Sequence, residues 1–484
     1  MKSSLRPVLM MIGVMVMVLS AAMLAPGVLD AVEGEGESAS AFFISSILCL
    51  FVGSATALAN RGPVDSITPR GAFVLTVGSW LALSLCAALP MRLSGQDMSW
   101  TNAIFESVSG LTTTGSTVVT GLDGKPLGFL LWRAILQWIG GIGIIVAAIA
   151  FWPILRVGGM QLFRIESSDT SDKVLPRAQS IATGIFAVYA GLTVACAVGY
   201  RLTGMNTFEA IVHAMTTLST GGYSTSDSSM GAFTSGGADI VSIGFMVFGA
   251  LPFTLLLVAA QGKPGPLLSS SQVQAFIAIC LVMAAAVTLG LVLNQTQLDI
   301  AAWRHAAFNT VSVITGTGYA STDYTIWGSG FATLFFVLTF FGGCSGSAVG
   351  GMKIFRLQIA VSALRRYMGN LLRPHAVIPI FYNGRTVAQG TIHAVLGFLF
   401  AFYAVFAISA ALLSAMGLDS TTALSGAATS LANVGPGLGS TIGPAGTFVS
   451  LPDPAKWVLA VNMLIGRLEV FAVLVFFSPR FWRG

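Results

Sequence analysis

Four short segments of the chain could replace the water shell of a cation with main-chain carbonyl oxygens. They read TTGST at 113–117, TGGYS at 220–224, GTGYA at 316–320 and NVGPG at 433–437. Carbonyl oxygens that point inward one after another require unusual backbone angles, which glycine adopts at little cost. The segments therefore predict a cation filter made of main chain, centred on Gly115, Gly222, Gly318 and Gly435.

The first three positions of each segment are the residues expected to contact the ion. They are Thr113, Thr114, Gly115, Thr220, Gly221, Gly222, Gly316, Thr317, Gly318, Asn433, Val434 and Gly435. None is a carboxylate, which argues against a pore for divalent cations. For one segment alone, an ordinary external turn is the better interpretation. Four equivalent segments favour convergence on one axis, because non-helical backbone at membrane depth must be buried or face water.

The elements that must position these segments are membrane-spanning helices. The chain has 484 residues, 55% hydrophobic and 9% charged, whereas soluble proteins carry roughly a quarter charged residues. Many apolar runs reach about 20 residues, the length that crosses a bilayer. The expected spans are approximately 8–28, 41–60, 71–91, 127–151, 181–203, 237–260, 273–294, 329–350, 391–416 and 456–478. The net charge of +5 does not indicate a nucleic-acid partner, because the basic residues mark loop orientation.

The connections that carry the glycine segments share one pattern. In each, a half-apolar stretch of roughly 10–14 residues, too short to span, precedes the glycines and predicts a re-entrant helix. Asn206 and Glu209 form a capping-box pattern at one such start. Four repetitions predict an all-α polytopic membrane protein with four helix–re-entrant pore loop–helix repeats and two extra N-terminal helices. The expected divisions are 1–70 for the N-terminal pair and 71–180, 181–272, 273–390 and 391–484 for the repeats.

Charge in the loops predicts the orientation of the chain. Acidic residues fill the connection after the first span, whereas basic residues gather in the alternate connections: Arg61, Arg70, Arg156, Arg164, Lys173, Arg177, Lys263, Lys353, Arg356, Arg365, Arg366, Arg373 and Arg385. The positive-inside rule places these basic loops and both termini in the cytoplasm. The first apolar run is rather long for a signal peptide, so we expect a retained helix.

A glycine-rich run interrupts the eighth expected span. The sequence FFGGCSGSAVGGMK at 340–353 contains Gly342, Gly343, Gly346, Ser347, Gly350 and Gly351. Small residues spaced as Gly342 and Gly346 also occur where helices pack closely. So many of them at the middle of a span favour an unwound segment instead, and we expect 273–390 to contain an intramembrane gating loop.

Arg467 lies inside the last apolar span, in the sequence GRLE at 466–469. An ionisable residue at this depth is either functional or part of a structural ion pair. A direct pair with Glu469 is not expected, because residues two apart on a helix do not face each other. Glu106, Glu209, Arg133 and His305 flank the loops and are expected to brace the re-entrant helices rather than touch the ion.

Enzyme function finds no support in the sequence. The five cysteines show no CxxC spacing and the four histidines form no HExxH pattern. A secondary transporter with a substrate site in broken helices remains an alternative, although such proteins often contain inverted repeats, and here every glycine segment lies on the same side.

Five motifs resemble the Trk/Ktr/HKT superfamily of potassium transporters, and within it the TrkH type of membrane subunit. They are TTTGSTV at 112–118, QWIGGIGI at 137–144, STGGYST at 219–225, NVGPGLG at 433–439 and GRLE at 466–469. The resemblance covers essentially the whole chain. It implies potassium as the transported ion, with no bound cofactor, and a pseudo-fourfold pore in a bacterial inner membrane.

The same resemblance implies partners and roles for single residues. Its members form homodimers in membrane lipid and bind a cytosolic TrkA-like ring of nucleotide-binding subunits. It assigns Arg467 to the pore below the filter and the run 340–353 to a loop that obstructs it. In related plant transporters a serine at the first filter glycine accompanies sodium preference, so Gly115 favours potassium. The three glycines of QWIGGIGI, at 140, 141 and 143, are expected to serve helix packing.

Overall fold

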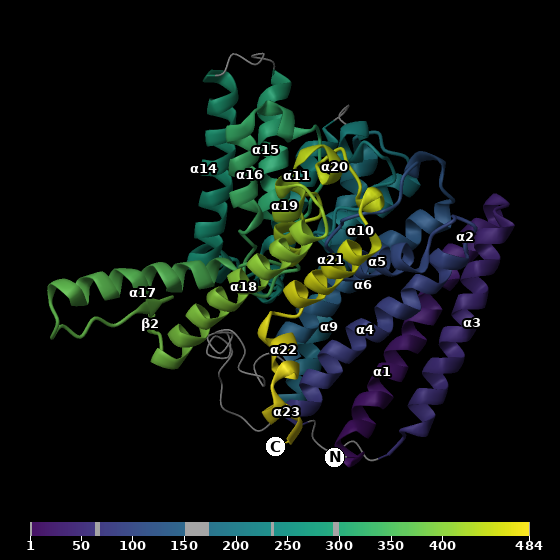
Figure 1. The fold of residues 1–484 in the computed structure, drawn as a ribbon, viewed down its shortest axis with the longest axis horizontal. Helices are drawn as coiled ribbons and strands as arrows, with labels where there is room; N and C mark the ends of the chain where they lie inside the picture. The colour runs from purple at the N-terminus through teal and green to yellow at the C-terminus, as the bar shows by residue number, and fades with distance from the viewer. Residues whose placement is uncertain (1, 63–67, 151–173, 234–236, 294–299, 484) are drawn as a thin grey trace.

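The computed structural model describes residues 2–62, 68–150, 174–233, 237–293 and 300–483 (Figure 1). Within these ranges, seven helices are long and apolar enough to cross a membrane, and nine if two bent pairs are counted as spans. The uninterrupted spans are α1 with α2 (Lys2–Ala22 and Leu24–Glu33), α3 (Gly36–Ala59), α4 (Pro69–Leu93), α6 (Leu127–Ala150), α9 (Val174–Leu202), α14 (Ser271–Leu293) and α18 (Gln389–Ala415). The prediction of a polytopic helical protein is confirmed.

Four shorter helices lie between pairs of spans, as the repeats predict. They are α5 (Trp100–Leu111), α10 (Thr207–Leu218), α15 (Ile300–Ile314) and α19 (Ser420–Ala432). Side chains that accept a backbone N–H begin three of them: Ser99 for α5, Asn206 for α10 and Asp419 for α19. The capping box predicted at Asn206 and Glu209 is confirmed. These caps satisfy N–H groups that a helix start otherwise leaves unpaired.

Three expected spans are not continuous helices. The sixth divides into α11 (Ala238–Ala250) and α12 (Phe253–Ala260), bent by 105°. Pro252 lies at this break, and proline cannot donate the hydrogen bond that a continuous helix needs. The tenth divides into α21 (Asp453–Arg467) and α22 (Phe471–Leu474), with a bend of 107° measured through Phe477. The eighth is helical only as α16 (Ser329–Thr339) and then becomes a loop. Hydropathy cannot distinguish a broken apolar segment from a straight one.

The remaining elements are short. They are α13 (Gly265–Ser269), α20 (Gly439–Ile442), α23 (Pro479–Arg483) and the 3-10 turns at Leu122–Gly124, Ser229–Phe233, Tyr324–Trp327, Phe448–Ser450 and Val475–Phe477. An arm made of α17 (Ile354–Leu372) and an antiparallel hairpin, β1 (Phe381–Tyr382) with β2 (Arg385–Thr386), extends sideways from the body in Figure 1.

The two N-terminal spans pack on each other through a close backbone contact, and one buried carboxylate joins them to the first repeat. Gly13 and Gly53 face each other so closely that a Cβ atom on Gly13 would lie 2.7 Å from the Gly53 carbonyl oxygen. Asp30 in α2 is buried; it accepts the backbone N–H of Gly128 at 2.5 Å and the hydroxyl of Ser38 at 2.6 Å. Asp30 therefore satisfies an N–H group in the first turn of α6.

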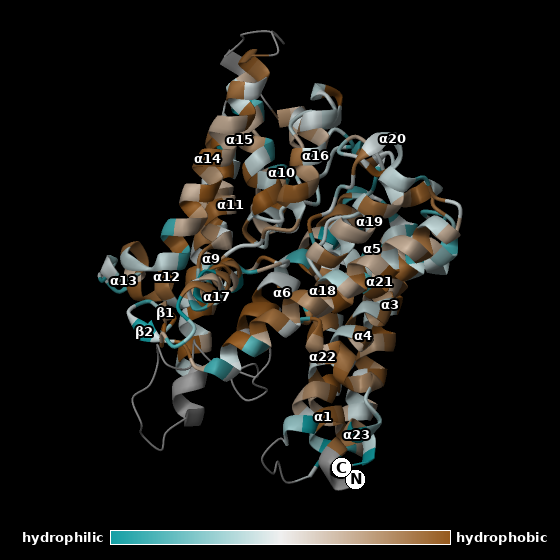
Figure 2. Cartoon of the chain, turned by 60° about the vertical axis from the view of Figure 1, so that its left-hand side comes forward, coloured by the Kyte–Doolittle hydropathy of each residue, from teal (hydrophilic) through white to brown (hydrophobic). Residues whose placement is uncertain are grey.

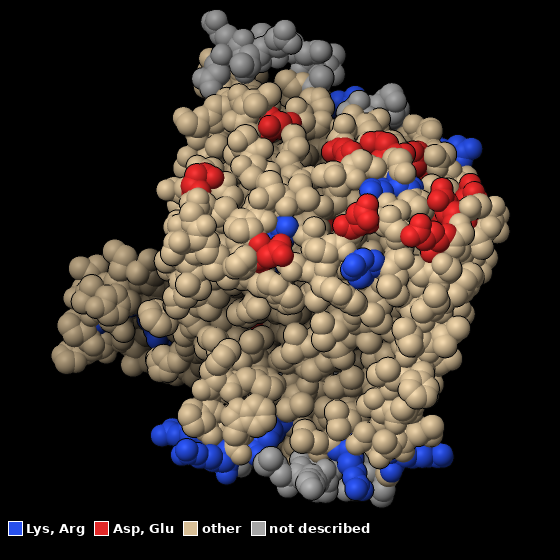
Figure 3. Space-filling view, turned by 45° about the vertical axis from the view of Figure 1, so that its right-hand side comes forward, with Lys and Arg blue, Asp and Glu red and all other residues tan. Residues whose placement is uncertain are grey.

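Hydrophobic, acidic and basic residues occupy different parts of the molecule. The helices are largely hydrophobic in Figure 2, whereas the β1–β2 hairpin is hydrophilic. On the face shown in Figure 3, acidic side chains lie in the upper half and only basic ones mark the lower edge, where Figure 1 places both termini. The basic loop with Arg156, Arg164 and Lys173 lies outside the described residues.

Candidate cation path

The four glycine segments adopt the same backbone conformation. The first position is left-handed in every repeat, and the third position is a glycine that is also left-handed. The φ angles are 53° at Thr113, 53° at Thr220, 66° at Gly316 and 56° at Asn433, and then 85°, 75°, 78° and 109° at Gly115, Gly222, Gly318 and Gly435. A β-branched threonine seldom adopts a positive φ, which costs about 1–3 kcal/mol. Two strained threonines at matching positions indicate a functional loop.

Each segment also ends its re-entrant helix with the same hydrogen bond. The N–H of the middle residue donates to the carbonyl five residues earlier: Thr114 to Ser109, Gly221 to Thr216, Thr317 to Ser312 and Val434 to Thr429, at 2.9 to 3.1 Å. A left-handed residue followed by this bond is the Schellman ending of a helix. The bond uses a carbonyl of the re-entrant helix and none of the segment's own carbonyls.

The four segments meet in a closed ring. A Cβ atom on Gly115 would overlap the carbonyl oxygen of Gly221, one on Gly222 that of Thr317, and one on Gly318 that of Val434. One on Gly435 would lie 2.9 Å from the carbonyl oxygen of Thr114, which closes the circle. Each repeat therefore faces the next through a glycine on one side and a carbonyl on the other. The expected convergence on one axis agrees with this geometry.

Buried charges brace the ring from behind. Arg133 on α6 donates to Glu106 on α5 at 2.9 Å and to the carbonyl of Ser224 at 3.0 Å. Glu106 also accepts the backbone N–H of Val118 at 2.9 Å, so one ion pair ties the loops of repeats 1 and 2 together. Glu209 caps α10, and His305 contacts the Ser321 hydroxyl at 2.8 Å. The bracing predicted for these four residues is confirmed.

Sequence reasoning missed three side chains that hold the segments. Tyr223 donates to the carbonyl of Glu106 at 3.0 Å, and Tyr319 lies 2.5 Å from the Thr216 hydroxyl. Both tyrosines directly follow a filter glycine and reach back to the preceding repeat, a shared position that could have signalled their role. Gln137 donates to the carbonyl of Gly221 at 2.6 Å. Gln137 begins the motif QWIGGIGI, but that motif drew attention only to its glycines.

A cavity of about 610 Å³ opens on one side of the ring. Hydroxyl groups, glycines and one guanidinium share its wall, among them Gly115, Ser116, Gly222, Gly318, Gly435 and Arg133. The cavity is lined mainly by the connections that follow the short helices α5, α10 and α19. It forms a polar approach to the ring.

The glycine-rich run 340–353 lies on the other side of the ring and is not helical. Its backbone bonds to the break in repeat 2: Cys344 donates to the Ala250 carbonyl at 2.9 Å and Ala348 to the Gly249 carbonyl at 3.1 Å. A Cβ atom on Gly350 would lie 2.8 Å from Asn433. The run therefore packs directly under the filter segments. The unwound interpretation is confirmed, and the helix-packing interpretation of Gly342 and Gly346 is wrong.

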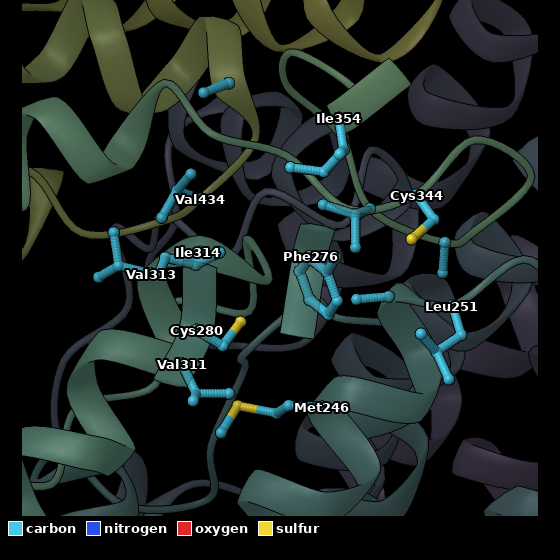
Figure 4. Packing of buried hydrophobic residues seen from close by; sticks show 14 of the residues in the cluster. Met246, Leu251, Phe276, Cys280, Val311, Val313, Ile314, Cys344, Ile354 and Val434 are labelled. Atoms are coloured by element: carbon cyan, nitrogen blue, oxygen red, sulfur yellow. The ribbon is translucent and has the colours of Figure 1, made fainter. Parts of the chain in front are cut away.

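Apolar contacts connect the loop 340–353 to the α11 break, to α14 and to a glycine segment of the ring. Figure 4 shows Cys344 of the loop in the same buried cluster as Leu251 at the α11 break and Phe276 on α14. The cluster continues to Val434 in the filter segment of repeat 4. Movement of the loop therefore disturbs packing that reaches the ring.

Buried cations hold the carbonyls of the loop. Arg467, the last residue of α21, donates to the Ala348 carbonyl at 2.6 Å and to the Gly140 carbonyl at 3.1 Å. Lys353 donates to the Val349 carbonyl. Glu469 pairs with Arg356, so the expectation that it does not pair with Arg467 is confirmed. The reason differs from the one expected, because Glu469 has a φ of 61° and lies outside the helix.

The glycines of QWIGGIGI serve packing at two of three positions. A Cβ atom on Gly140 would overlap the Leu111 carbonyl, and one on Gly141 would lie 2.6 Å from the Tyr189 hydroxyl. No atom of the described residues lies within 4 Å of a Cβ atom on Gly143, so packing within this part of the chain does not require that glycine.

Comparison with known proteins agrees with this geometry. A family model described as TrkH, cation transport protein, matches residues 38–483. The chain belongs to the TrkH family. The match runs from α3 to α23, and so contains all four glycine segments, the loop 340–353 and Arg467.

Relatives within the TrkH family match over nearly their entire length. The chain is 46% identical over 480 residues to Trk system potassium uptake protein TrkI of Halomonas elongata, covering 99% of this chain and 97% of the relative. It is 35% identical to Trk system potassium uptake protein TrkH of Escherichia coli K12, covering 99% of each. The crystal structure of the potassium transporter TrkH from Vibrio parahaemolyticus superposes with a TM-score of 0.91 at 35% identity, covering 99% of each chain. The four-repeat architecture with two additional N-terminal helices is therefore the fold of this TrkH-family chain.

Proposed function

We propose that the chain mediates potassium uptake across the membrane through a filter of main-chain carbonyls. The observation that carries the proposal is the closed ring, in which each filter glycine faces a carbonyl of the next repeat. Carbonyl oxygens replace the hydration shell of a cation without supplying net charge, which suits a monovalent ion. Potassium is the transported substrate, as the names of the relatives say of those proteins.

Three buried side-chain oxygens give this proposal a second support. Thr113 Oγ1, Thr220 Oγ1 and Asn433 Oδ1 have no hydrogen-bond partner among the described residues. All three occupy the left-handed first position of their segments. Leaving a buried polar atom unpaired costs about 1–3 kcal/mol, and a dehydrated cation would satisfy all three. These oxygens extend the proposed path from the carbonyl ring toward the loop 340–353.

The proposed gate is the layer beneath the filter. Gly342, Gly343, Gly346, Ser347, Gly350 and Gly351 give the loop backbone freedom, and Arg467 adds a fixed positive charge at the same depth. The loop closes the path sterically, while the charge opposes a dehydrated cation. A switch of this kind needs two arrangements that differ by only a few kcal/mol.

The proposed setting is a bacterial inner membrane, with the basic edge and both termini in the cytoplasm and the 610 Å³ cavity outside. The proposed assembly is a homodimer in lipid that binds a cytosolic TrkA-like nucleotide-binding subunit. The repeat boundaries at 71, 181, 273 and 391 belong to the same proposal.

Purified protein in liposomes tests the transport proposal. Flux of potassium, rubidium and sodium should be measured with and without a proton gradient. The filter proposal expects potassium and rubidium to permeate well above sodium under either condition. Uptake that requires the proton or sodium gradient would favour the secondary-transporter alternative.

Docking of the regulatory subunit is tested on the arm. Arg365, Arg366 and Arg373 lie on α17 or at its end, directly after the proposed gate loop. A pull-down with a TrkA-like subunit should lose most of its yield when Arg365 and Arg366 are both changed to glutamine. Full retention would mean that these charges only orient the chain.

A further inference from the structure

Gln137 occupies a place beside the filter that the transport proposal does not explain. It lies on α6 and is completely buried. Its Nε2 donates to the Gly221 carbonyl at 2.6 Å, and its Oε1 accepts the N–H of Tyr223 at 3.0 Å. One carboxamide thus binds main-chain groups on both sides of Gly222. Buried amides with both ends satisfied are rigid and specific in their position.

The equivalent residues of two other repeats are identified by the packing of their helices. In three repeats a glycine packs against the carbonyl of the leucine that stands three residues before the middle filter position. A Cβ atom on the glycine would collide with that carbonyl. The pairs are Gly140 with Leu111, Gly249 with Leu218 and Gly466 with Leu431. The three glycines are therefore in register. Three residues before each of them are Gln137, Met246 and Met463, all buried. Repeat 1 therefore has a glutamine where the two matching helices have a methionine.

The filter segment of repeat 2, which Gln137 contacts, differs from the other three segments at its middle position. The middle filter residues are Thr114, Gly221, Thr317 and Val434, so only repeat 2 lacks a side chain there. The backbone of Gly221 does not require glycine, because its φ is not positive. Space requires it: a Cβ atom on Gly221 would overlap the Gln137 carboxamide.

We infer that Gln137 is a positioning residue that sets ion selectivity, by supplying from α6 the side chain that repeat 2 lacks at Gly221. This inference rests on the proposed filter. The Gly221 carbonyl belongs to the ring, facing Gly115 of repeat 1. A donor at 2.6 Å fixes its position and withdraws part of its electron density from the ion. The quadrant between repeats 1 and 2 therefore has a stiffer, weaker carbonyl ligand than the other three.

A replacement that keeps volume and removes hydrogen bonding separates this role from simple packing. Gln137→Met installs the residue found at the two matching positions. We expect the protein to fold and transport potassium, with the potassium-over-sodium flux ratio in liposomes lowered by roughly five-fold, the value of one buried hydrogen bond. Gln274→Met on α14 is the matched control, because the Gln274 side chain is exposed and bonds only the Leu268 carbonyl. That control should keep the wild-type ratio.

A single and a double variant test whether the Gln137 side chain occupies the space that a side chain at position 221 would fill. Gly221→Ala alone should lower potassium flux, because the new methyl group displaces the buried Gln137 carboxamide from its two backbone partners. The double variant Gln137→Ala with Gly221→Ala should recover flux, since the shortened side chain vacates that volume. Thermal unfolding of each purified variant in detergent shows whether a loss of flux reflects loss of the fold.

The outcomes separate this inference from the proposal on which it rests. A selective wild type with a lowered ratio in Gln137→Met and recovery in the double variant supports it. A selective wild type with an unchanged ratio in Gln137→Met, or with Gly221→Ala fully active, overturns the role of Gln137 and leaves the filter proposal intact. A wild type that does not discriminate potassium from sodium overturns the filter proposal and this inference together.

Discussion

The filter ring and the layer beneath it are built in opposite ways. In the ring, four loops repeat the same left-handed angles and the same Schellman bond. In the layer beneath, repeat 3 alone supplies the loop 340–353, and the cations that hold it come from repeats 3 and 4 through Lys353 and Arg467. A ring proposed to surround an ion needs matching groups on all sides. A switch needs only one element that can leave.

The ring and the loop beneath it are also held by different kinds of contact. The ring is closed by glycine–carbonyl contacts too tight to admit a methyl group. The loop carbonyls of Ala348 and Val349 are instead bound by long cationic side chains, which can be withdrawn without breaking a helix. The loop proposed to move is also fixed through its backbone at Ala250 and Gly249, so only part of its support comes from side chains with rotatable bonds.

The strongest challenge to this comparison is a methyl group inside the ring. Gly318→Ala combines a positive φ with overlap of the Val434 carbonyl. Strain and overpacking together amount to roughly 3 kcal/mol or more, so we expect potassium flux in liposomes to fall by about 100-fold or more. Gly330→Ala is the control, because nothing lies within 4 Å of a Cβ atom there and its φ is ordinary. Wild-type flux in Gly318→Ala would mean that the ring is not tight.

Removing the brace behind the ring should have the next largest effect. Glu106→Ala leaves Arg133 buried without its carboxylate, and breaking such a pair typically costs about 3–5 kcal/mol. We expect a markedly lower unfolding temperature in detergent, together with reduced discrimination against sodium. Asp453→Ala provides a contrast, since its pair with Lys456 is at 3.6 Å and the aspartate is exposed. Exposed pairs contribute at most about 1 kcal/mol. Equal destabilisation by the two changes would contradict the bracing role.

Changes in the lower layer should raise flux rather than abolish it. Arg467→Ala removes a buried charge and the bond that holds the Ala348 carbonyl. A unit charge beside the path opposes a cation by a few kcal/mol, so we expect basal potassium flux to rise about ten-fold or more. Deleting residues 346–349 should act in the same direction.

Both lower-layer variants should keep the potassium-over-sodium ratio, because the ring lies outside the altered layer. Lost selectivity without increased flux would show that Arg467 shapes the filter. In that event the gate lies elsewhere and the contrast between the two regions fails.

The smallest expected effect concerns the helix starts around the ring. Asp419 caps α19 by accepting the Thr422 N–H at 3.0 Å, so Asp419→Ala should lower the free energy of unfolding by about 1 kcal/mol at pH 7. Hydrogen bonds from Thr422 hold the pKa of Asp419 below its usual value. This stabilisation is fully present above the unfolded pKa of about 3.9 and is lost as the pH falls through the lower folded pKa.

Ser99→Ala at the start of α5 should destabilise to a similar extent without that pH dependence, because a hydroxyl cap does not titrate. Comparison of the two variants by thermal unfolding at pH 3 and pH 7 measures the difference. A pH dependence of equal size in both would exclude Asp419 as its source.

Much of this architecture follows from the sequence for two reasons. Bilayer thickness fixes the length of a span, and a pattern repeated four times identifies the equivalent segments. Hydropathy placed the spans, and four short apolar stretches before glycine revealed the re-entrant helices. The breaks at Pro252 and Leu468–Val470 were missed, since an apolar window has the same composition whether straight or bent. The pairing of Glu469 with Arg356 joins residues 113 positions apart and follows only from the fold.

The pair Gln137 and Gly221 shows where single-sequence reasoning ends. Glycine at 221 looked like a demand of the backbone, as at Gly222, but its φ is ordinary and a neighbouring helix requires it. Two residues with no shared local motif explain each other only when they are seen in contact.

The closed ring also sets an order on the making of the protein. Ser116 donates to the carbonyl of Gly435 at 2.7 Å, a contact between residues 319 positions apart. At roughly 5–20 residues synthesised per second, the first filter loop waits on the order of 15 to 60 seconds before its last neighbour exists. During that interval the loops of repeats 2 and 3 are added one after the other, and the ring stays an open arc until the fourth loop exists. A chain that stops before the fourth repeat therefore has an open ring, and prematurely terminated translation yields an unfinished bundle without the proposed filter.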